Sequence, residues 1–153
     1  MIGKVAALPD DENQPVEINA DRSEFFLEDG AQTVIYYGTA EAPAEFVQGS
    51  LIVSGMELTI VRRQGDVERI VATGKPARFQ QQPAIDQGII YANGNSISFS
   101  GDIVRIEDQG ELIQDGIIWS GCLIEWNLDT QSGQSSSDNC QQRTQTIIPA
   151  EAK

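Results

Sequence analysis

Apolar and polar residues alternate along much of this chain, with a period of two. The alternation is clear over residues 16–21, 56–61 and 122–129. Successive side chains of a β-strand point to opposite faces, so this pattern is typical of strands that bury one face. No window of about eleven residues keeps the apolar stripe of an amphipathic helix. The sequence therefore predicts an all-β protein.

Turn-forming residues separate the alternating runs. Glycine, asparagine, aspartate and proline fix the backbone of tight turns, and here they cluster between runs at residues 28–30, 64–66, 74–76, 93–95, 108–110 and 115–116. The intervals are commonly about eight to fifteen residues, which is too short for the helical crossover that parallel strands require. We therefore expect antiparallel hairpins and meanders.

The length and charge of the chain limit its class and its partners. A chain of 153 residues with 40% hydrophobic residues is one domain long and has enough apolar side chains for a core. The formal net charge of −13 repels phosphate backbones, which argues against nucleic acid as a partner. No apolar run approaches the roughly 20 residues of a membrane-spanning helix.

Both ends of the sequence are expected to lie outside the sheet. Residues 1–12 form an expected flexible N-terminus, either the remnant of a removed export signal or an ordinary frayed end. The β-domain is expected over residues 13–130. Residues 131–138 are polar and of low complexity, so 131–153 is predicted to be a polar tail with one short strand at 144–148.

The chain has two cysteines, Cys122 and Cys140. An even pair is bridged in an oxidising compartment, and Cys140 lies in a polar segment where a free thiol would be exposed, so we predict a disulfide. The alternative is two unpaired thiols, with Cys122 packed on its strand as a small apolar residue. The spacing matches neither a metal site nor a redox motif.

Catalytic apparatus is missing from the sequence. The chain has no histidine, which removes the commonest general base, the commonest metal ligand and every histidine-dependent triad. No phosphate-binding loop, dinucleotide fingerprint or nucleophile elbow is present. Glu57, Asp66 and Glu68 are the remaining candidates for a carboxylate pair, but 23 acidic residues make such pairs common by chance. We expect no enzyme, no metal and no cofactor.

Several short motifs occur in an order that resembles the OstA-like family of periplasmic lipopolysaccharide-transport proteins. They lie at residues 14–21, 49–61, 74–79, 90–92 and 96–99, and the resemblance covers roughly residues 13–130. The central motif is Gly-Lys-Pro-Ala-Arg-Phe at 74–79. The resemblance implies an antiparallel, V-shaped β-jelly roll with an apolar groove, whose protomers stack end to end.

The resemblance also implies which residues bind lipid. Family members place apolar side chains in the groove, where they take the acyl chains, at the positions that match Val16, Ile18, Phe79, Ile97 and Phe99. Alternation alone adds three further candidates, Met56, Leu58 and Ile60.

The implied function is a non-enzymatic periplasmic bridge that shields the acyl chains of lipopolysaccharide. The implied partners are an inner-membrane C component, an outer-membrane receptor and further copies of the chain. One alternative is the periplasmic domain of that C component or the N-terminal domain of that receptor. An alternative from another class is a structural or adhesive β-protein that binds protein or polysaccharide through exposed Tyr36, Tyr37, Trp119 and Trp126.

Overall fold

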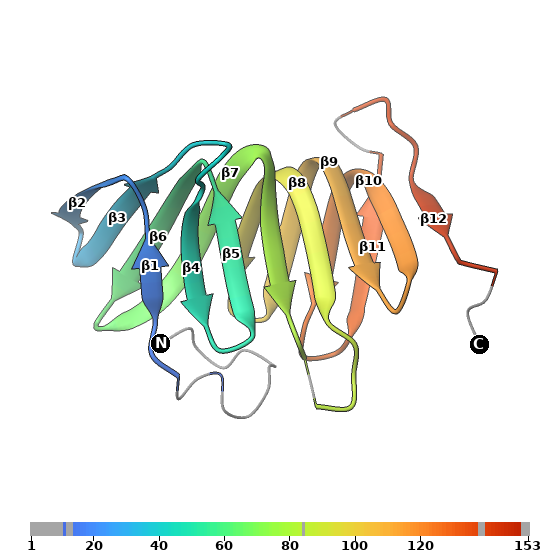
Figure 1. The fold of residues 1–153 in the computed structure, drawn as a ribbon, viewed down its shortest axis with the longest axis horizontal. Coiled ribbons are helices and arrows are strands. Elements are labelled where there is room, and N and C mark those ends of the chain that lie inside the picture. Colours follow the sequence, from blue (N-terminus) through green and yellow to red (C-terminus); the bar gives the residue numbers. More distant parts are fainter. Residues whose placement is uncertain (1–10, 12–13, 84, 138–139, 151–153) are drawn as a thin grey trace.

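A computed structural model describes residues 11, 14–83, 85–137 and 140–150 of the chain. Twelve strands form one antiparallel sheet, which folds over into two layers (Figure 1). The predicted all-β, antiparallel architecture is confirmed. The described part of the chain contains no helix long and apolar enough to cross a bilayer. We name the layers front and back after their positions in Figure 1.

Eight strands lie in one layer each. The front layer contains β1 (Glu17–Asn19), β4 (Ala44–Gln48), β5 (Leu51–Gly55) and β12 (Gln145–Ile147), and the back layer contains β2 (Arg22–Glu28), β3 (Ala31–Tyr37), β6 (Glu57–Arg63) and β11 (Ser132–Ser136). Four longer strands belong to both layers: β7 (Asp66–Gln81), β8 (Ile90–Ser100), β9 (Ile103–Gln114) and β10 (Ile117–Asn127).

The long strands join the two layers. The first half of β7 pairs with β6 in the back layer, and its second half pairs with β5 in the front layer. Register shifts interrupt the β7–β8, β8–β9 and β9–β10 ladders at matching heights. Such irregularities bend a strand. The bends line up near the top of Figure 1, so the layers diverge from one shared edge as a V.

Glycine is required where the long strands bend. A Cβ atom added to Gly94 of β8 would lie 2.6 Å from Cγ2 of Ile106, and one added to Gly110 of β9 would lie 2.9 Å from the same methyl group. Ile106 is fully buried and fills the inner side of the bend. The glycines therefore let the backbones approach the core where a side chain would collide with it.

We expect Gly94→Ala to lower the free energy of unfolding by about 1–2 kcal/mol, because the new methyl group overpacks the bend against Ile106. Urea denaturation followed by circular dichroism measures the change. In the same experiment Ile106→Leu, which removes the β-branch, should lessen the effect of the alanine in the double variant. Additive effects of the two substitutions would show that the collision is not what destabilises the protein.

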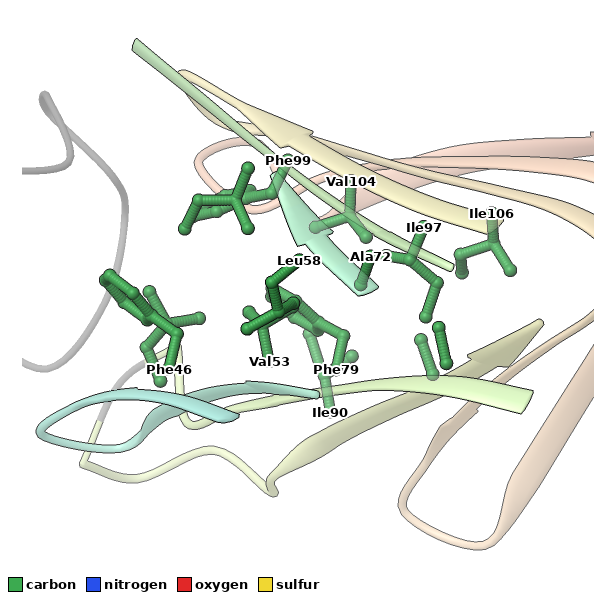
Figure 2. Packing of buried hydrophobic residues seen from close by; sticks show 14 of the residues in the cluster. Phe46, Val53, Leu58, Ala72, Phe79, Ile90, Ile97, Phe99, Val104 and Ile106 are labelled. Carbon is green, nitrogen blue, oxygen red and sulfur yellow. The ribbon is translucent and has the colours of Figure 1, made fainter. Parts of the chain in front are cut away.

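The hydrophobic core lies between the two layers (Figure 2). Phe46, Val53, Phe79 and Ile90 point inward from the front layer, and they meet side chains from the back layer that include Leu58, Ile97 and Phe99. Along these strands, buried residues such as these seven alternate with more exposed ones, as the period of two requires. Their burial is the main stabilising contribution of the fold.

The sheet extends further toward the C-terminus than the sequence predicted. Residues 131–138 were expected to lie outside it, but β11 pairs with residues 123–127 of β10. An edge strand needs only backbone hydrogen bonds on one side, so serine, glycine and glutamine can form it with largely exposed side chains. The short strand predicted at 144–148 is present as β12, which pairs with residues 118–120 of β10.

Cys122 and Cys140 are joined by a disulfide, with their Cα atoms 6.0 Å apart. Cys122 is buried on β10, and Cys140 lies in the segment between β11 and β12. The bridge therefore ties this segment to the bend of β10.

The expected flexible N-terminus, 1–12, lies outside the described residues except at Asp11. This residue is buried, and its carboxylate accepts a hydrogen bond from the backbone amide of Ser50 at 2.9 Å and another from the Ser50 hydroxyl. Asp11 is thus fixed to the turn between β4 and β5.

Candidate functional site

The candidate site is the apolar interior between the layers. Phe79 of the front layer and Phe99 of the back layer meet there edge to face, with ring centroids 5.5 Å apart and planes at 63°. Aromatic rings favour this geometry. Because the two rings come from opposite layers, their contact holds the layers together in the middle of the core.

Five of the eight predicted site residues lie in this interior. Phe79, Ile97, Phe99, Leu58 and Ile60 are each at most 2% exposed. They come from β6, β7 and β8, which the pairing of β7 with both other strands brings together. Phe79, Ile97 and Phe99 were chosen from the family motifs and Leu58 and Ile60 from alternation, and all five lie at inward positions of their strands.

The three other predicted site residues lie at the margin of the interior or outside it. Ile18 of β1 is partly buried and packs against the core, whereas Val16 and Met56 are each 40% exposed. Val16 precedes β1, and Met56 lies between β5 and β6. Alternation predicts a shared face only within a strand, so residues beyond the strand ends do not follow it.

Other residues complete the interior and were not singled out from the sequence. They are apolar side chains at inward positions of the same strands and their neighbours: Phe46, Leu51, Val53, Ile70, Ile90, Val104, Ile106, Leu112, Ile124 and Leu128. The period of two marks most of these positions. What the sequence does not mark is where each long strand bends, and therefore which residues face each other across the layers.

In this structure the apolar interior is closed. The largest inward side chains, among them Phe46, Phe79 and Phe99, are less than 2% exposed, and they fill the space between the layers. The largest cavity described, about 900 Å³, lies instead on the outer face of the bend, where Lys75, Asn93 and Asn95 contribute to a polar lining. An empty apolar slot in water would be unstable by roughly 25 cal/mol per Å² of exposed surface, so the layers close on each other.

The interior is also electrically neutral among the described core residues. Tyr36 of β3 packs against its margin, and burial raises the pKa of its phenol above the ordinary value of 10.0, an effect that Arg62 partly opposes. The phenol is uncharged at neutral pH even at its ordinary pKa, and the raised pKa delays its ionisation further on the alkaline side. Tyr36 therefore adds no charge to the apolar space at neutral pH.

The carboxylates considered for catalysis do not come together. Glu57 begins β6, while Asp66 lies opposite Arg63 at the other end of the β6–β7 hairpin. Glu57 and Arg63 lie six positions apart along β6, a rise of about 20 Å. Glu68, near Asp66, forms an ion pair with Arg63 at 3.0 Å. The described residues likewise contain no group of three potential metal ligands.

The aromatic residues considered for an adhesive surface are not freely exposed. Tyr36, Trp119 and Trp126 pack against the hydrophobic core, and Tyr37 donates a hydrogen bond to Glu24 at 2.7 Å. Three of the four aromatic residues named for the alternative function are therefore partly buried. For Trp119, alternation alone could not reveal this, because the register shift between Gly121 and Leu123 puts it on the same face as Trp126.

The two ends of the folded sheet carry strands with a free edge. At one end these are β1 and β2, and at the other end they are β12 and β11, as Figure 1 shows. All seven residues of β2 are exposed, including Phe25 at 72% and Leu27 at 76%. Free strand edges with apolar side chains can pair with further strands.

The chain is similar in sequence to known lipopolysaccharide transport and export proteins. Residues 17–132 match the family described as LptA/(LptD N-terminal domain) LPS transport protein. The lipopolysaccharide export system protein LptH of Pseudomonas aeruginosa is 32% identical over 128 residues, which cover 82% of this chain and 70% of that protein. LptA of Haemophilus influenzae is 24% identical over 151 residues, with coverages of 95% and 83%.

A solved structure is similar as well. It is the crystal structure of LptH, described as the LptA-homologous periplasmic component of the lipopolysaccharide transport device of Pseudomonas aeruginosa. The TM-score is 0.74 at 27% identity, and the match covers 92% of this chain and 99% of that one. The likeness therefore extends over most of the two-layered fold.

Proposed function

This chain belongs to the LptA and LptD N-terminal-domain family of lipopolysaccharide transport proteins, and from this premise we propose that it carries lipopolysaccharide across the periplasm. The acyl chains of the lipopolysaccharide occupy the interior between the two β-layers, and the sugars of the lipopolysaccharide stay in water. The proposed function is lipid transport rather than catalysis. The observation that carries the proposal is the unbroken apolar lining from Phe46 of β4, through Phe79 and Phe99, to Leu128 after β10.

The physical basis is the transfer of hydrocarbon out of water. Each buried methylene contributes about 0.8 kcal/mol, so even one acyl chain enclosed in this interior would be held strongly. A transport protein must also let the lipid go. An interior that closes on itself favours release of the lipid, because the contacts between layers, such as Phe79 with Phe99, compete with the lipid for the same surfaces.

Loading requires the layers to separate. They are joined along the bends of β7 to β10 and by the chain connections from β1 to β2, β3 to β4 and β5 to β6; away from these connections they meet through side chains. Opening the V about its bent edge exposes Ile97, Phe99 and the residues opposite them without breaking a β-ladder. Acyl chains then replace the contacts between layers. The eight residues predicted from the sequence contribute unequally, with Val16 and Met56 at the rim rather than in the lining.

The partners follow from the free strand edges. We place further copies of the chain, an inner-membrane C component and an outer-membrane receptor at the two ends, where β1 and β2 or β11 and β12 offer unpaired backbone groups. The disulfide between Cys122 and Cys140 suits an oxidising compartment such as the periplasm. The sugar and phosphate head remains outside in water, so it does not have to contact a protein of net charge −13.

A photo-crosslinking amino acid at position 99 tests the function. We expect ultraviolet irradiation in the presence of purified lipopolysaccharide to give an adduct, because Phe99 points into the interior from β8. The same probe at position 97 should also react. Immunoblotting for lipopolysaccharide on a denaturing gel detects the adducts.

Position 98 provides the matched control. Ser98 lies on the same strand between Ile97 and Phe99, and its side chain points to the opposite face of the sheet. We expect little or no adduct from it. Equal capture at 98 and 99 would indicate adsorption to the outside, and no capture at 97 or 99 would refute the proposed function.

A further inference from the structure

Trp119 and Trp126 of β10 contact each other across the interior. Trp119 lies opposite Leu112 in the front layer, and Trp126 lies opposite Val104 in the back layer. Residues directly opposite in an antiparallel ladder share a face, and both partners are buried core residues, so both indoles point inward. Their centroids are 6.2 Å apart, with planes at 33°.

The tryptophan pair is the last apolar layer at this end of the core. Beyond β10, the residue opposite Trp119 is Thr146 of β12, and the residue opposite Trp126 is Gly133 of β11. A Cβ atom added to Gly133 would lie 2.8 Å from Cε3 of Trp126, so the indole extends over β11. The hydrocarbon lining therefore ends at these two rings, where threonine and glycine replace it.

The nitrogen of Trp126 gives a second, independent observation. Nε1 is buried and has no hydrogen-bond partner among the described residues. A buried indole N–H nearly always finds an acceptor, and leaving it unpaired destabilises the state in which it occurs. No acceptor among the described residues is placed to bond with it in the closed interior. An ester carbonyl or hydroxyl on an acyl chain is the kind of acceptor that would satisfy it.

We propose that Trp119 and Trp126 form an acyl-chain contact site at the β10 end of the interior. When no lipid is bound, the two rings pack on each other and close this end of the interior. They separate to pack on an acyl chain that bears an ester or hydroxyl oxygen. This inference rests on the proposed function, because it assumes that acyl chains enter between the layers.

Quenching by a brominated lipid tests the contact directly, because these two residues are the only tryptophans of the chain. Trp119→Phe leaves Trp126 as the single emitter, and Trp126→Phe leaves Trp119. Bromine quenches an indole only at contact distance. We expect dibromostearate to remove most of the emission of each variant, and stearate at the same concentration to remove little. Equal emission with the two fatty acids would overturn the proposal.

Retention of lipopolysaccharide gives a second readout. We expect Trp126→Ala to release preloaded lipopolysaccharide to detergent micelles about tenfold faster, as the loss of one large apolar contact would produce. Tyr91→Ala is the matched control, since Tyr91 is 45% exposed on the outer face of β8 and should not alter release. Release at the wild-type rate from Trp126→Ala, with its circular dichroism spectrum intact, would count against the site.

Crosslinking at position 99 separates this inference from the proposed function. Capture of lipopolysaccharide there, without bromine quenching of either tryptophan, would refute the tryptophan site and leave the carrier function standing. Absence of capture would refute both. Should Trp126→Ala fail to fold, the two phenylalanine variants keep a ring at each position and still decide the question through quenching.

Discussion

Replacing Phe79 with alanine is expected to lower the free energy of unfolding by about 3–5 kcal/mol, the range for removing a buried phenylalanine ring. Phe79 is 1% exposed, and its ring contacts Phe99 across the two layers. The substitution leaves a cavity at the point where the layers meet and removes an aromatic contact as well. Urea denaturation, followed by circular dichroism, measures the change.

Phe25→Ala is the matched control, because Phe25 is 72% exposed on β2. It should change the free energy of unfolding by no more than about 0.5 kcal/mol. If Phe79→Ala had an effect as small as the control, the interior would be loosely filled, and the closed state described above would be wrong.

The same burial decides how lipid capture should be tested. An aspartate at position 79 or 99 would place an unpaired carboxylate among residues that are at most 2% exposed, which unfolds most domains of this size. Loss of lipid capture by such a variant would then report loss of the fold. Probes that add a reactive group while keeping an apolar ring, such as the crosslinker at 99, avoid this ambiguity.

The sequence predicts the strands better than it predicts their arrangement. Period-two alternation identifies the inward residues of β6, β8 and the end of β7 because a strand's geometry is local. The bends are set by contacts between strands. Gly94 and Gly110 read as ordinary turn residues in the sequence, and only the position of Ile106 shows why they are glycines. The layer to which each half of a strand belongs therefore could not be deduced.

The candidate site shows the same limit. Phe79, Ile97 and Phe99 were predicted from the family motifs, and the structure places them together in the interior. Trp119 and Trp126 were considered for an exposed surface only under the alternative function, and simple alternation along β10 gives them opposite faces. The register shift between Gly121 and Leu123 turns both inward. An inserted residue in a ladder leaves no reliable mark in the sequence, so this part of the site required the structure.

Removing the disulfide is expected to destabilise the C-terminal end of the sheet and lower the free energy of unfolding by about 3 kcal/mol. Cys122 and Cys140 are 18 residues apart, and closing a loop of that length restricts the unfolded chain by about this amount. The native state also loses its tether, because β12 is held otherwise by only three residue pairs with β10, and its side chains are exposed. Urea denaturation of the Cys122→Ala/Cys140→Ala variant measures the effect.

A reducing agent provides the control for this prediction. It should lower the denaturation midpoint of the wild-type protein toward that of the double alanine variant, and it should leave the variant unchanged. Amide hydrogen exchange should locate the loss: residues 145–147 exchange faster without the bridge, while the amides of β8 keep their relative protection. An unchanged midpoint in both tests would mean that β12 and the segment before it are held by their own pairing, and that the bridge between Cys122 and Cys140 contributes little to the fold.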